Sequence, residues 1–195
     1  EISDQEKFVS SKDFVAEEAV FDRVFKVGQK STVCLPFGPS TEKGKFYRLS
    51  KESGSILIFD EVSSPEGNTP YIYVASEEGT LRASQANIKA TPETMNSTST
   101  ESGFHLVGIY QTTPVKNIYG FSVDGELLKA SYATMNPFRS FIQSPVDVSG
   151  AKVWKASFDG EMTGIDSIVS DGAAVVDVLN LNGILLKKQV KRLEA

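Results

Sequence analysis

The segment Val153-Trp154-Lys155-Ala156-Ser157-Phe158 decides the fold class. Its large and apolar members Trp154, Ala156 and Phe158 fall on one side of an extended chain, because successive side chains of a strand point to opposite faces. The polar residues between them fall on the other side. Such alternation is typical of a sheet with one buried face and one face in water. The segment therefore predicts a strand at the surface of a β-rich domain.

Runs of the same kind recur along the chain and are rich in Val, Ile, Phe and Tyr, which favour strands. About ten such runs, spaced by roughly 8 to 15 residues, favour a sandwich or barrel over βαβ units. We expect an all-β protein built as an antiparallel β-sandwich of jelly-roll or immunoglobulin-like type. The other expected strands are Ala19–Val27, Thr32–Phe37, Phe46–Leu49, Ile56–Val62, Tyr71–Ala75, Phe104–Tyr110, Ile118–Val123, Glu126–Ala130 and Phe138–Gln143.

Turn residues between these runs support hairpins. Asp124-Gly125 and Asn182-Gly183 suit two-residue turns with positive φ, and Ser53-Gly54 separates two further runs. Helical signals are few: Asp13–Ala19 fits one helical turn, and Gln189–Ala195 fits a short terminal helix.

Two polar segments predict loops. Thr91–Gly103 has almost no apolar residues. Asp159–Gly164 follows the last strand of the first run and precedes the segment that leads into the hairpin around Asn182-Gly183. We place a domain boundary near residue 161, with a β-sandwich over 1–160 and a linker and C-terminal β-hairpin over 161–195. No internal repeat of fixed period is visible.

Charge and hydropathy narrow the classes of partner. The net charge is -5, and the densest basic run is Lys187-Lys188-Gln189-Val190-Lys191-Arg192. Most of such a surface would repel a phosphate backbone, so nucleic-acid binding is disfavoured. Apolar stretches such as Ile56–Phe59 are too short to span a bilayer, and we expect no membrane span.

A single Cys and a single His limit the chemistry of the chain. One cysteine excludes an intramolecular disulfide, and one Cys with one His cannot form a Cys/His zinc site. Cys34 lies between apolar residues and is predicted to pack as a small hydrophobe, and His105 is predicted to be a strand histidine. We expect no catalytic residue, no metal and no cofactor.

Aromatic and acidic residues leave two alternatives open. Tyr71, Tyr73, Tyr119 and Trp154, with Tyr110 and Tyr132, can stack on sugars if several lie exposed in a row, or can fill the core. A glycoside hydrolase would need two converging carboxylates in a cleft, whereas Glu17-Glu18 and Glu77-Glu78 are typical of solvated surface. The first alternative predicts a carbohydrate-binding module and the second a hydrolase.

Several fragments, in this order, resemble a β-sandwich module found near the C-termini of secreted and cell-surface proteins of Bacteroidetes-type bacteria. Asp159–Asp166 resembles the link that joins this module to a C-terminal sorting-domain hairpin, and Val176–Gly183 is similar to the first strand of that hairpin. The remaining fragments are Phe21–Phe25, Ser31–Phe37, Asn68–Ile72, Asn117–Phe121 and Asn136–Phe141.

The resemblance implies a non-enzymatic accessory module that is extracellular or on the outer-membrane surface. It has no catalytic residues to carry over. Its implied partners are a cell-surface glycan or another domain of the parent protein. Sorting domains of this type continue with a further strand, whereas this chain stops at Leu193-Glu194-Ala195. We therefore expect the hairpin to be truncated, with an edge open to β-edge self-association.

Overall fold

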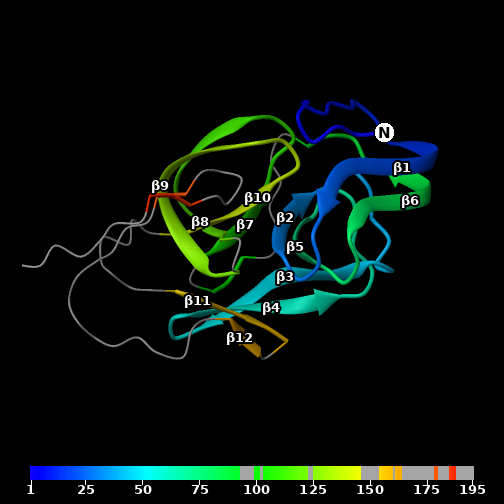
Figure 1. The fold of residues 1–195 in the computed structure, drawn as a ribbon. Helices are drawn as coiled ribbons and strands as arrows, with labels where there is room; N and C mark the ends of the chain where they lie inside the picture. The colour runs from blue at the N-terminus through cyan, green and yellow to red at the C-terminus, as the bar shows by residue number, and fades with distance from the viewer. Residues whose placement is uncertain are drawn as a thin grey trace, which may run out of the picture.

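A computed structural model describes most of the chain (Figure 1). It covers residues 1–92, 99–101, 103–122, 125–145 and 154–159, and the backbone alone of 161–163, 178–179 and 185–187. Within these residues every regular element is a strand, so the protein is all-β, as its sequence predicts.

The largest sheet has six strands and forms the middle of the molecule. One of its pairings is parallel: β11 lies beside β4, with Lys155 opposite Ile56 and Phe158 opposite Phe59. The fold is the expected β-sandwich, and this parallel pair of strands is a departure from its antiparallel pairing. The chain reaches β11 only after passing through the second sheet, and parallel neighbours require such a long crossover. The order is β12 (Glu161–Thr163), β11 (Lys155–Phe158), β4 (Ile56–Val62), β3 (Gly44–Ser53), β5 (Pro70–Ala75), β2 (Lys30–Cys34).

A four-stranded sheet and a two-stranded ribbon accompany this sheet. In Figure 1 they lie on opposite sides of β2 and β5. The four-stranded sheet has the order β7 (His105–Gly108), β10 (Ser140–Gln143), β8 (Thr113–Phe121), β9 (Leu127–Met135), and the ribbon pairs β1 (Phe14–Phe25) with β6 (Gly79–Ile88).

The ribbon corrects two expectations. Residues 14–19, where a helical turn is expected, belong to β1, whose Phe14 pairs with Ile88 of β6. Strand β6 itself is not among the expected strands, because its sequence contains few β-branched or aromatic residues. Pairing with a long partner decides its structure instead. The helix expected at Gln189–Ala195 lies outside the described residues.

Turn chemistry predicts the hairpins well. Gly54, with φ of 62°, and Ser55 form a two-residue turn between β3 and β4, one position later than the expected Ser53-Gly54, because Ser53 pairs with Ile56. At the end of β8, the Ser122 amide donates to the Glu126 carbonyl at 2.9 Å and Gly125 has φ of 80°, while Asp124 of the expected turn lies outside the described residues. Near the C-terminus, β13 (Val178–Leu179) pairs antiparallel with β14 (Leu185–Lys187), as expected of a hairpin.

Buried side chains form three clusters that correspond to the layers. Strand β5 is buried on both faces: Tyr71 and Tyr73 belong to cluster one, towards the ribbon, and Ile72 belongs to cluster two, towards the four-stranded sheet. Cluster three lies on the other face of the four-stranded sheet and contains Ile109, Val115, Ile118, Ala133 and Phe141. The six-stranded sheet is therefore the central layer of the fold.

Candidate functional site

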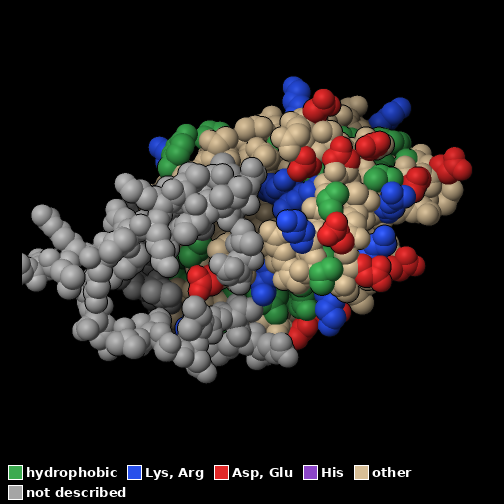
Figure 2. Space-filling view, in the orientation of Figure 1, with side chains coloured by type: hydrophobic (Ala, Val, Ile, Leu, Met, Phe, Trp, Pro, Cys, Tyr) green, Lys and Arg blue, Asp and Glu red, His purple; other side chains and the backbone are tan. Residues whose placement is uncertain are grey.

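A groove of about 1200 Å³ lies beside β2. The β1–β2 connection and β2 line one side of it, β8 and β9 line the other, and the start of β10 lies between them. Four cationic side chains and one carboxylate are among the described lining residues: Arg23, Lys26, Lys30, Arg139 and Asp4. Figure 2 shows Lys and Arg side chains gathered near the middle of the visible face, in the region of β2. We call this feature the cationic groove.

Arg23 faces inward because it lies on the same face of β1 as two buried residues. Phe21 and Phe25, two positions before and after it, belong to cluster one, whereas the neighbouring Val24 is exposed. The Arg23 Nη1 donates to the Thr32 carbonyl at 3.2 Å, and its guanidinium carbon lies 4.7 Å from the centroid of the Phe25 ring. These contacts attach Arg23 to β2.

Arg139 reaches the same place from the chain segment that leads into β10. Its Nη2 lies 2.7 Å from Asp4 Oδ2, and the side chains are 13% and 16% exposed. The next residue, Ser140, donates its hydroxyl to the Val33 carbonyl at 2.8 Å, which fixes this segment against β2. Arg23 and Arg139 therefore converge on β2 with only one carboxylate between them among the described lining residues.

The pKa values reflect this excess of positive charge. Burial, and then the like charge of Arg139, lower the pKa of Arg23 to about 9, against a smaller opposite effect of Asp4. Burial alone would raise the pKa of Asp4, but the hydrogen bonds from Arg139 and Gln5 outweigh it and hold that pKa below its usual value. Asp4 is therefore a carboxylate at neutral pH.

Two buried polar atoms of the groove have no hydrogen-bond partner within the described structure: Arg139 Nη1 and Ser31 Oγ. Ser31 lies on β2 and is 4% exposed. Buried polar atoms in native proteins nearly always have a partner, so such atoms require an explanation. Both residues line the groove.

The opposite side of the groove is apolar and continues cluster three. Asn117, with φ of 51°, interrupts the alternation of β8, so Val115 and Ile118 both belong to this cluster. Tyr132 of β9 also lines the groove, and 63% of its surface is exposed. The groove thus combines cationic donors with an apolar side that carries an exposed aromatic ring.

The four aromatic residues proposed as an exposed binding surface are instead buried in the core. Tyr71 and Tyr73 pack against Phe46, and the rings of Tyr119 and Trp154 pack against Phe104. The prediction that they form a sugar-stacking surface is wrong. A central sheet covered on both faces needs these large side chains to fill its two interfaces.

The remaining candidate groups lie apart from the groove. Cys34 is buried in cluster one, where burial raises the pKa of its thiol to about 12. His105 is half-buried at the start of β7, where it pairs with Gln143. The acidic pairs Glu17-Glu18 and Glu77-Glu78 are exposed, as expected of solvated surface. The described residues contain no cluster of His, Cys, Asp and Glu that would hold a metal ion.

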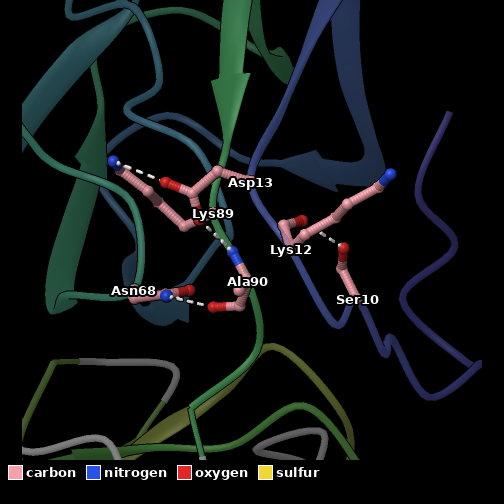
Figure 3. A network of polar contacts seen from close by, with 6 residues as sticks. All are labelled: Ser10, Lys12, Asp13, Asn68, Lys89 and Ala90. Carbon is pink, nitrogen blue, oxygen red and sulfur yellow. Dashed lines mark hydrogen bonds and ion pairs between the residues drawn. The ribbon is translucent and has the colours of Figure 1, made fainter.

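A second polar network lies near Asn68 (Figure 3). The Asn68 side chain donates to the Ala90 carbonyl at 2.7 Å and accepts from the Tyr110 hydroxyl at 2.7 Å. Asp13 accepts from the Ala90 amide at 2.8 Å and pairs with Lys89 at 3.0 Å. These contacts join the N-terminal segment, the end of β6 and the core, so we assign them a structural role.

Sequence reasoning missed the residues that define the groove. Arg23 had a usable signal, because it occupies an inward position in the alternation Phe21-Asp22-Arg23-Val24-Phe25. Ser31 shares the phase of the buried Val33 in the same way. The ion pair of Arg139 with Asp4 joins residues 135 positions apart. Nothing in the local sequence predicts that contact.

Comparisons with known proteins add no relative: no family model, curated protein or solved structure matches the chain. Within the described residues, no helix has the length and apolar character needed to cross a membrane.

Proposed function

We propose that this chain is a non-catalytic accessory module of a secreted or cell-surface bacterial protein, with the cationic groove as its binding surface. One observation supports this most directly. The groove combines four cationic side chains with an apolar side, and Asp4, the single carboxylate among its described lining residues, is already paired with Arg139. Such a mixture of apolar surface and a few directed polar groups is typical of ligand sites.

The state of Asp4 favours binding over glycoside hydrolysis. A hydrolase needs a second carboxyl group within about 10 Å of the first, and its general acid needs a raised pKa. The pKa of Asp4 is lowered instead by its hydrogen bonds. A carboxylate held in this way positions Arg139 and is a poor proton donor.

The partners in this proposal are a cell-surface glycan or a neighbouring domain of the parent protein. The resemblance of the C-terminal hairpin to a sorting domain supports an extracellular or outer-membrane location. We further predict that the chain self-associates through a sheet edge and that it does not bind nucleic acid. The first is checked by light scattering over a concentration series.

Location and catalysis are tested together. A tagged parent protein in its native host should appear in the extracellular or surface fraction, and protease added to intact cells should remove the tag. The purified chain should release no reducing ends from a panel of polysaccharides. A purely cytosolic protein, or steady release of sugars, would contradict the proposal.

A further inference from the structure

The cationic groove contains two unsatisfied donors at the place where its positive charges meet. Arg139 uses Nη2 for Asp4, which leaves Nη1 buried without a partner within the described structure. Ser31 Oγ is in the same condition on the adjacent strand. A buried group left without a hydrogen bond is costly, and an acceptor that enters the groove removes that cost. A guanidinium N–H can only donate, so the missing partner of Arg139 is an acceptor, and the Ser31 hydroxyl can donate to the same group.

The charge balance specifies what kind of acceptor fits. Among the described lining residues, the side chains of Arg23, Arg139, Lys26 and Lys30 are cationic and Asp4 is the single carboxylate, although the whole chain carries a net charge of -5. The two guanidinium groups lie near Asp4, whereas the Lys30 amine lies 5.5 Å from the centroid of the Phe158 ring. Concentrated positive charge on an acidic protein selects for an anion. A planar guanidinium binds carboxylate or sulfate oxygens through charge-assisted hydrogen bonds.

The other side of the groove specifies what carries the anion. Tyr132 presents an exposed ring, and Ala130 and Met135 of the same strand also line this side. Apolar lining residues next to cationic ones suit a ligand with an apolar face and an acidic group. A volume of about 1200 Å³ lies just above the roughly 300 to 1000 Å³ typical of small-molecule sites, so the groove has room for a short oligomer.

We propose that the cationic groove binds an acidic oligosaccharide, with Arg139, Arg23 and Ser31 holding a carboxylate or sulfate group and Tyr132 stacking on a sugar ring. This proposal rests on the proposed function, since it names the ligand of the same groove. Of the six aromatic residues named in the sequence-based carbohydrate hypothesis it keeps Tyr132 alone, because the other five are buried.

The test is calorimetric titration of the whole chain with four probes. These are a trimer of galacturonic acid, a neutral galactose trimer, sodium sulfate and a hexaglutamate peptide. The acidic trimer should bind at least about tenfold more tightly than the neutral one, and its affinity should fall with added salt. Sulfate should bind weakly and compete with the acidic trimer.

Variants assign the contacts. Ser31→Ala and Arg139→Lys should each lower the affinity for the acidic trimer by about tenfold, and Arg139→Lys keeps a cation beside Asp4, so the fold is retained. Tyr132→Ala should weaken the acidic trimer but leave sulfate binding unchanged. Arg82→Met is the matched control: Arg82 pairs with Glu18 at the surface of β6 and does not line the groove, so this variant should bind like the wild type.

Three results would overturn the proposal: no binding of either acidic probe, equal losses in Arg82→Met and Arg139→Lys, or hexaglutamate binding as tightly as the acidic trimer. The last result would assign the groove to an acidic protein segment. Failure of the ligand assignment stays distinct from failure of the proposed function. The first gives a surface-exposed protein without trimer binding, and the second gives a cytosolic protein or a trimer cleaved during the titration.

Discussion

The two polar networks of this molecule differ in how completely their hydrogen bonds are satisfied. Around Asn68, the side-chain amide, the Tyr110 hydroxyl and the Ala90 amide and carbonyl all have partners within the protein. In the cationic groove, Arg139 Nη1 and Ser31 Oγ have none within the described structure. A network that stabilises the fold satisfies its own groups, whereas a network that serves a ligand keeps donors available. Substitutions in the network around Asn68 should therefore lower the free energy of unfolding more than substitutions in the cationic groove.

The largest effect is expected next to the satisfied network, at Gly108. A Cβ atom at this position would overlap both Cβ and Sγ of Cys34, which is fully buried. Gly108→Ala should lower the free energy of unfolding by about 3 kcal/mol, because a packed core cannot absorb the added methyl group. Urea unfolding measures this loss. Labelling of the Cys34 thiol at pH 8 should accelerate with it, because burial raises that thiol's pKa to about 12 and protects it in the native state.

Two results at Gly108 would contradict this expectation. These are unchanged stability, or equally fast thiol labelling of the wild type and the variant. Gly28→Ala is a useful reference, because that glycine has φ of 75° but open space where a Cβ would be. It should report backbone strain alone, with a loss of about 1 kcal/mol.

A somewhat smaller effect is expected at Asn68 itself. Asn68→Ala should lower the free energy of unfolding by about 2 to 3 kcal/mol, because it removes the acceptor of the Tyr110 hydroxyl and leaves a backbone of φ 63° without Asn or Gly. Asn68→Gly separates the two causes, since glycine tolerates that φ but makes no side-chain hydrogen bond. Equal stability of the glycine variant and the wild type would show that the hydrogen bonds contribute nothing.

A much smaller effect is expected in the groove at Arg23. Arg23→Met should change the free energy of unfolding by less than about 1 kcal/mol at pH 7, because the lost contacts to Thr32 and Phe25 are offset by removal of a desolvated charge. The groups facing this guanidinium are Arg139 and Asp4, with Lys26 and Lys30 along the same groove. A loss as large as that of Asn68→Ala would show that Arg23 serves the fold.

The pH dependence of the stability difference between the wild type and Arg23→Met tests whether the charge of Arg23 destabilises the native state. The folded pKa of Arg23 is about 9, below the ordinary arginine range above 12, so its charge is penalised in the native state at neutral pH. As the pH rises above 9, the native state releases this proton before the unfolded state does, and the stability of the wild type should rise relative to Arg23→Met. A flat difference between pH 8 and pH 11 would contradict this.

The smallest effect is expected for Asp13 at acidic pH. The Ala90 amide, and then Lys89, lower the pKa of this carboxyl, so it contributes stability above the unfolded pKa that is lost as the pH falls through the folded one. Asp13→Asn should flatten the acid limb of a stability profile measured below pH 4. Asp22→Asn, which replaces an exposed carboxylate of β1 outside this network, is the matched control.

Local sequence patterns predicted most of the fold and little of the site. The alternation in Lys155–Phe158 and the turn at Gly54 are short-range features, so the corresponding strands and hairpin were predictable. The expectation that Ser157 faces water is wrong, because this side chain is buried. Strand β6 was missed because its pairing with β1, and not its own composition, decides its structure.

The site depends on contacts that no local pattern contains. Arg139 and Asp4 meet only after the N-terminal segment and β10 come together. The sequence shows that Arg23 points inward, but not that its guanidinium donates to the Thr32 carbonyl of a neighbouring strand. The prediction that four aromatic residues form an exposed binding surface was wrong for a related reason. Alternation shows that a side chain belongs to a face, but not whether a second layer covers that face.

The burial of β5 on both faces also has a consequence for unfolding. Tyr73 belongs to the core towards the ribbon, while Ile72 belongs to the core towards the four-stranded sheet, so neither core can open without exposing the same strand. The three layers should therefore unfold as one cooperative unit, and the amides of β5 should exchange with solvent only by global opening. Such a module resists stepwise proteolytic trimming, because a protease finds no layer that can detach while the others stay folded.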